Sequence, residues 1–155
     1  MEIFKIGIIG SLKPNFDIED AKEKIIESID LILKYHPDKK YQVISVMTNE
    51  GIPKHAYDIA KEKYKFLTVG YASEMIYQGK YGVYPVDEKK IVGEKYGDEC
   101  QYLINNINCL IRIGGGYQSN YEVEEFKNLL LSKSINLNLN HYIIEKEINW
   151  IKSSQ

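Results

Sequence analysis

The sequence has few of the residues that disulfide frameworks, metal sites and basic nucleic-acid surfaces require. It has only two cysteines, and none of its three histidines is spaced as a metal ligand with a cysteine or carboxylate. Twenty basic residues face 22 acidic ones, a net charge of −2, whereas a dedicated nucleic-acid binder usually has a basic domain. No apolar run approaches the ~18 residues of a membrane span. We therefore expect no metal, no nucleic-acid partner and no membrane partner.

The length and the first residues of the chain predict one cytoplasmic domain. A chain of 155 residues, 44% of them hydrophobic, buries roughly 70% of its unfolded surface and needs no disulfide or metal to fold. The N-terminus enters a strand-like pattern at once and lacks the basic, then apolar layout of a secretion signal. We expect a single domain over residues 1–155.

Arginine is almost absent, because 19 of the 20 basic residues are lysine. The single arginine, Arg112, directly precedes a glycine triplet. In a lysine-rich chain, a single arginine at this position has two explanations. One is chance, and the other is a requirement at this site for the five N–H donors of a guanidinium, which lysine lacks. Both interpretations stay open at this level.

Apolar periodicity predicts strands that alternate with helices. Asp17 is the expected N-cap of the first helix, and Pro53 suits the first turn of the second. The expected strands are residues 2–9, 41–47, 66–69, 91–92, 108–113 and 135–139. The expected helices are residues 17–35, 53–64, 71–78, 98–106 and 120–131, and an amphipathic stretch over 143–151 is expected to include a C-terminal helix over 142–150.

This alternation predicts an α/β fold, a Rossmann-like sandwich with a mostly parallel central sheet flanked by helices. Several strands are continuous apolar runs, which suits burial on both faces of a parallel sheet. In such sheets ligands bind outside the carboxyl ends of the strands, near the point where the strand order reverses. The candidate loops at that edge are Gly10–Ser11, Thr48–Gly51, Gly70–Ser73 and Gly114–Ser119.

The segment from Arg112 to Glu122 is the most specific of these. Three glycines between an apolar strand and a helix are able to form a nest of N–H groups for an anion. Gln118 and Ser119 add side-chain donors. Ser119 and Glu122 also have the spacing of a capping box, so a purely structural role is open for both. For Gly10 and Gly70, a tight turn is likewise an open alternative.

These residues resemble the SLOG superfamily, whose members include the "lonely guy" phosphoribohydrolases that activate cytokinins. The family motif is Gly-Gly-x-Gly-Thr-x-x-Glu, and residues 115–122 match it with Gln118 in place of glycine and Ser119 in place of threonine. Residues 49–60 look like the second glycine-bearing strand–helix junction of the same fold. Gly97-Asp98-Glu99 and the Gly-Gly-Gly-x-Gln-Ser run resemble a bacterial and phage subgroup.

The resemblance implies a pocket for a nucleotide or an ADP-ribose-like ligand, with the glycine nest on phosphate and Glu122 facing the ribose. The hydrolases also use an upstream arginine, which is missing here. Residues 87–99 offer only Lys89, Lys90 and Lys95. The resemblance implies these ligand-binding residues: Gly10, Ser11, Asn49, Glu50, Gly51, Gly70, Gly114, Gly115, Gly116, Tyr117, Gln118, Ser119 and Glu122.

Two functions follow as expectations. One is a binding protein without a cofactor that senses or sequesters a nucleotide-derived immune signal, in the host cytoplasm if the chain is phage-encoded. The other is a nucleoside monophosphate N-glycosidase with Glu122 as the catalytic residue. A structural role that uses the fold alone is a third alternative. The resemblance also implies a homodimer or higher homo-oligomer.

Overall fold

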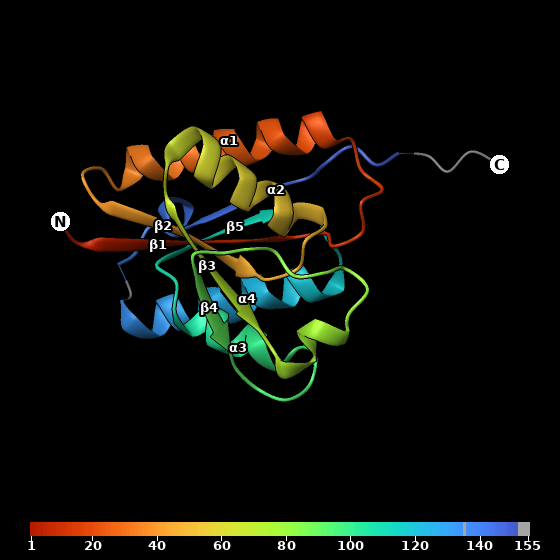
Figure 1. The fold of residues 1–155 in the computed structure, drawn as a ribbon. Helices are drawn as coiled ribbons and strands as arrows, with labels where there is room; N and C mark the ends of the chain where they lie inside the picture. The colour runs from red at the N-terminus through yellow and green to blue at the C-terminus, as the bar shows by residue number, and fades with distance from the viewer. Residues whose placement is uncertain (135, 152–155) are drawn as a thin grey trace.

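The computed structural model describes residues 1–134 and 136–151, which form a six-stranded sheet with helices on both faces (Figure 1). All neighbouring strands are parallel, in the order β4-β3-β2-β1-β5-β6. This confirms the Rossmann-like α/β prediction. The strands are β1 (Ile3–Gly10), β2 (Lys40–Val46), β3 (Leu67–Ala72), β4 (Glu88–Ile91), β5 (Cys109–Ile113) and β6 (Ile143–Lys146).

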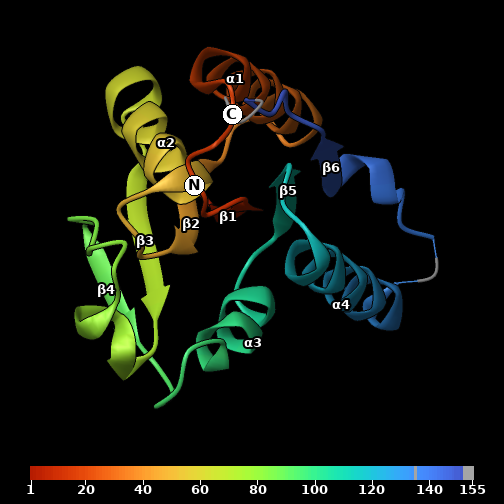
Figure 2. The ribbon, with the colours of Figure 1, turned by 90° about the vertical axis from the view of Figure 1, so that its right-hand side faces the viewer.

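Helices cover both faces of the sheet, as Figure 2 shows. α1 (Ile18–Tyr35) and α2 (Gly51–Ile59) lie on one face, and α3 (Asp98–Asn105) and α4 (Tyr117–Lys133) lie on the other. A π-helical turn (Ala60–Tyr64) extends α2. Short 3-10 turns occupy Glu74–Gln78 and Leu139–His141. Within the described residues, no helix has both the length and the apolarity that a bilayer span requires.

The two faces of the sheet bury separate apolar clusters. Under α1, the fully buried Ile25, Ile29 and Ile32 repeat at helical spacing against the sheet. The predicted N-cap of α1 is confirmed, because the Asp17 carboxylate accepts the Asp20 amide at 3.2 Å. On the other face, Leu103 of α3 and Phe126 of α4 pack with strand residues of the second cluster.

The C-terminal predictions were wrong. Residues 143–146 form strand β6, in register with β5, and not a helix. The two buried isoleucines there, Ile144 and Ile148, are four residues apart, a spacing that fits both a helix face and every second residue of an extended chain. The predicted strand over 135–139 is also wrong for residues 136–139, of which Leu139 begins a 3-10 turn, while residue 135 lies outside the described residues.

Candidate functional site

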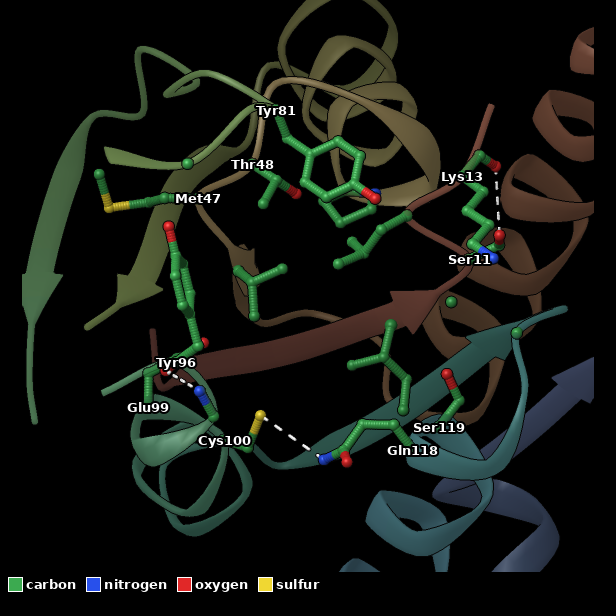
Figure 3. A pocket seen from close by; sticks show the side chains of 18 of the residues that line it. Ser11, Lys13, Met47, Thr48, Tyr81, Tyr96, Glu99, Cys100, Gln118 and Ser119 are labelled. Atoms are coloured by element: carbon green, nitrogen blue, oxygen red, sulfur yellow. Dashed lines mark hydrogen bonds between the residues drawn. The ribbon is translucent and has the colours of Figure 1, made fainter. Parts of the chain in front are cut away.

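A cavity of about 1100 Å³ lies at the carboxyl-terminal edge of the sheet. Its wall includes residues at or after the ends of β1, β2, β3 and β5, as the sequence predicted for this edge. It spans the position between β1 and β5 where the strand order reverses. Figure 3 shows Ser11 and Lys13 on one side of the cavity, with Met47 and Tyr96 on the other.

The glycine triplet forms the turn from β5 into α4. Gly114 and Gly115 adopt left-handed φ values of +60° and +94°. A Cβ on Gly115 would lie 2.9 Å from the Cβ of Ser119, so a side chain does not fit there. Gly115 and Gly116 line the cavity, and the 17-residue helix α4 starts directly after them. The positive end of a long helix therefore faces the cavity, which favours an anion.

The capping-box interpretation of Ser119 and Glu122 is wrong. α4 begins at Tyr117, three residues earlier than predicted, and its N-cap is Gly116 without a side-chain cap. Ser119 and Glu122 are therefore helical residues, and they are only 6% and 7% exposed. Both line the cavity. This placement leaves their side chains available to a ligand.

A buried carboxylate lies at the α3–α4 side of the cavity. Burial raises the pKa of Glu122 from its ordinary value of 4.5 to about 7, the nearby Glu99 carboxylate acts in the same direction, and the Gln118 amide partly opposes them. Burial also raises the pKa of Glu99, which lines the cavity from α3. A glutamic acid that titrates near neutrality is able to donate or accept a proton.

The predicted ligand-binding residues divide into two groups. Eight line the cavity: Gly10, Ser11, Gly115, Gly116, Tyr117, Gln118, Ser119 and Glu122. Asn49, Glu50, Gly51, Gly70 and Gly114 are not among the lining residues. Gly70 lies inside β3, which extends past the predicted end to Ala72, and a Cβ there would overlap the Met47 side chain.

Several lining residues were not selected from the sequence. Examples are Lys13, Met47, Lys80, Tyr96 and Trp150. Lys13 is the one with a usable signal, because it follows the predicted loop Gly10–Ser11 by two residues. Trp150 lies in the segment after β6. The sequence predicted a helix there, so Trp150 was not placed near the cavity. Among the tyrosines near this edge, Tyr71, Tyr81 and Tyr117 line the cavity, whereas Tyr84 is buried and donates to Asp58 at 2.6 Å.

Comparison with known proteins establishes the fold. No family model matches the chain, and no curated protein matches it. Solved structures do. The fold is similar to that of molybdenum cofactor carriers. The molybdenum cofactor binding protein from Rippkaea orientalis has 22% identity and a TM-score of 0.61, over 94% of this chain and 90% of that one.

Two further structures share the fold. The molybdenum cofactor carrier protein from Chlamydomonas reinhardtii has 16% identity and a TM-score of 0.58, over 92% of this chain and 88% of that one. The structural genomics target TM1055 has 14% identity and a TM-score of 0.61, over 96% of this chain and 93% of that one. At these identities the likeness shows a common fold.

The single arginine does not line the cavity and instead supports the glycine loop. Arg112 is 7% exposed, and its guanidinium donates to Glu145 at 2.9 Å, to Glu147 at 2.7 Å and to the carbonyl oxygen of Gly114 at 2.8 Å. The Gly114 amide in turn donates to the carbonyl oxygen of Lys146 at 2.8 Å. Arg112 thus joins β5, the chain after β6 and the first glycine of the turn, a task that uses its several N–H donors.

Replacing Arg112 with lysine should lower the free energy of unfolding by about 2 kcal/mol, because one ammonium cannot reproduce three charge-assisted hydrogen bonds of this geometry. Urea denaturation of the variant and the wild type measures this. Lys24→Met, which removes a partly exposed helical ion pair with Asp20, is the control and should cost less than about 1 kcal/mol. Equal losses would contradict this account of Arg112.

Cys100 is expected to be a poor nucleophile. Burial raises its pKa from 9.0 to about 12, and the charges of Glu122 and Glu99 add to the effect. The thiolate is the reactive form, so alkylation by iodoacetamide at pH 7.5 should be far slower than for a free cysteine. Replacing both Glu99 and Glu122 with glutamine should accelerate labelling of Cys100. Rapid labelling of the folded wild type, located by mass spectrometry, would contradict this prediction.

Proposed function

We propose that this protein binds a phosphate-bearing small molecule with a planar ring system in the cavity and keeps it intact. The observation that carries the proposal is the position of the cavity. The cavity lies where the strand order of the parallel sheet reverses. It is lined by the glycine turn and the N-terminus of α4 on one side and by apolar walls elsewhere. Ser11, Ser119 and Lys13 add polar and positive groups at this side.

Two ligand classes meet this description. One is the nucleotide-derived class that the SLOG resemblance implies, with ADP-ribose-like or cyclic nucleotide signals as examples. The other is the molybdenum cofactor, named for two proteins of the same fold and chemically a pterin phosphate. We propose that the chain is a SLOG-type member and a carrier or sequestering protein for one of them, assembled as a homodimer in the cytoplasm.

A thermal-shift and mass-spectrometric screen of the purified chain tests the proposal. The panel is AMP, ADP-ribose, cyclic ADP-ribose and molybdenum cofactor. A ligand present at 100 times its Kd should add ~2.7 kcal/mol to the free energy of unfolding, and it should be recovered unchanged. Failure of every panel member to raise the Tm would refute small-molecule binding of this class. Sedimentation of the same sample tests the dimer.

A second candidate function is the N-glycosidase, favoured by the pKa of about 7 at Glu122. An acid that titrates there suits proton transfer to a leaving base. Against it, Lys89, Lys90 and Lys95 are absent from the cavity lining, and Arg112 is engaged elsewhere. Recovery of free base and ribose phosphate from AMP, lost in Glu122→Gln, would establish this activity in place of carrying.

A further inference from the structure

Charge is distributed unevenly around the cavity. The lysines of its lining are Lys13 and Lys80, and the carboxylates are Glu99 and Glu122. Figure 3 shows Lys13 and Glu99 on opposite sides of the cavity. The α4 N-terminus adds positive potential near Ser119. A ligand with a phosphate at the glycine turn therefore presents its far end to a negative surface.

The two carboxylates have no cationic partner. Neither forms an ion pair within the described residues, although Glu122 is 93% buried. The polar groups around Glu122 are the Gln118 amide and the Glu99 carboxylate, and the Gln118 amide also reaches the Cys100 sulfur at 3.9 Å. A buried carboxylate beside an open cavity is costly unless a donor reaches it. The Glu99 carboxylate accepts the Gly97 amide at 3.0 Å, and the Gln118 amide serves Glu122, so each carboxylate keeps acceptor positions that are open to N–H donors of a ligand.

A metal ion is a poor candidate for that donor. Within residues 1–134 and 136–151, no three His, Cys, Asp or Glu side chains gather in a way that holds a metal. The adjacent walls are largely apolar and include Ile9, Val46 and the buried Tyr71. Apolar walls with a few converging polar groups suit a flat organic ring.

The spacing along α4 indicates whether the ring or the sugar of the ligand would reach Glu122. Glu122 follows Gly116 by six residues, which is about 9 Å along a helix axis. If a phosphate binds at the first amides of α4, its distance from Glu122 is roughly the length of a ribose phosphate. Glu122 would therefore face the base of a nucleotide, or the ring of a pterin, and not the atoms next to the phosphate.

We infer that Glu99 and Glu122 form a specificity subsite for two adjacent N–H donors on the edge of a 2-amino-4-oxopyrimidine ring, the edge that guanine and pterins share. A carboxylate accepts two parallel N–H groups in a bidentate pair. The inference deepens the proposed function and depends on it. It assigns to this chain a preference for one ring edge among phosphate-bearing ligands.

Calorimetric titration of the purified chain with GMP, IMP and AMP tests the subsite. The three probes carry the same ribose phosphate, but IMP lacks the 2-amino group, and AMP lacks both the 2-amino group and the ring N–H. We expect GMP to bind at least about tenfold more tightly than IMP or AMP, since an unpaired buried acceptor costs that much. A pterin monophosphate in the same series shows whether the subsite prefers the pterin ring or the guanine base.

The variants locate the preference. Glu122→Gln and Glu99→Gln should each reduce the ratio of GMP to IMP affinity to below about threefold, while AMP binding persists. Glu124→Gln, at an exposed position of the same helix, is the matched control and should keep the ratio. Equal binding of GMP, IMP and AMP by the wild type would overturn the inference and leave the proposed function standing. Failure of all four phosphates, together with the thermal-shift panel, would refute both.

Discussion

Glu122→Gln is expected to stabilise the ligand-free protein at pH 8 by about 2 to 3 kcal/mol. The cause is the burial that raises the pKa of Glu122 from 4.5 to about 7. Above pH 7 the folded protein holds a charged carboxylate in a place that disfavours it, whereas the unfolded chain exposes the same group to water. Glutamine has the same shape and no charge, so the variant avoids this cost.

The pH dependence has a defined sign. Between pH 4.5 and 7 the folded state keeps the Glu122 proton while the unfolded chain has lost it, so stability falls as pH rises through this interval. Below pH 4.5 both states are protonated, and the cost vanishes. The carboxyls of Asp20, Asp58 and Asp98 have lowered pKa values and contribute in the opposite sense at more acidic pH.

Urea denaturation at pH 5, 6, 7 and 8 separates these contributions. The difference in the free energy of unfolding between Glu122→Gln and the wild type should grow from pH 5 to 7 and then level. The exposed control Glu124→Gln should show no such growth. A difference that stays constant with pH would mean that Glu122 titrates at its ordinary value in the folded protein.

Gly116→Ala is expected to abolish phosphate-ligand binding while the fold stays intact. A Cβ on Gly116 would meet no atom within 4 Å, and its φ of −128° lies outside the left-handed region that favours glycine. The added methyl group would project into the open space beside the first amides of α4. Loss of one or two charge-assisted hydrogen bonds to the phosphate corresponds to roughly 100-fold in affinity.

Gly115→Ala provides the contrast. Its φ of +94° and the 2.9 Å approach to the Cβ of Ser119 make alanine strained at that position, so we expect a loss of about 2 kcal/mol in the free energy of unfolding. Circular dichroism melts and titration of AMP compare both variants with the wild type. Undiminished AMP binding by a well-folded Gly116→Ala protein would place the phosphate away from the glycine turn.

Local sequence patterns were sufficient where one interpretation dominated. The continuous apolar runs of β1 and β5 predicted buried parallel strands, and Asp17 predicted the start of α1. The order of strands and helices then placed the strand-end loops on one edge. Within the Arg112–Glu122 segment, residues 115–119 and Glu122 line the cavity, whereas residues 112–114, 120 and 121 do not.

Patterns that fit two structures were decided by long-range contacts. Ser119 and Glu122 have the spacing of a capping box, but α4 begins at Tyr117, directly after the glycine triplet. Both residues therefore lie inside the helix and do not cap it. The chain around Ile144 is amphipathic in either conformation, and pairing with β5 makes it a strand.

Apolar periodicity and chain connectivity were enough to predict the α/β alternation, the parallel sheet and the edge at which the cavity lies. Which side chains meet at that edge depends on how the helices pack on the sheet. Glu99 and Glu122 are 23 positions apart on different helices, and no local pattern joins them. The packing of α3 beside α4 brings them near each other, and burial, with a smaller contribution from the Glu99 charge, raises the pKa of Glu122.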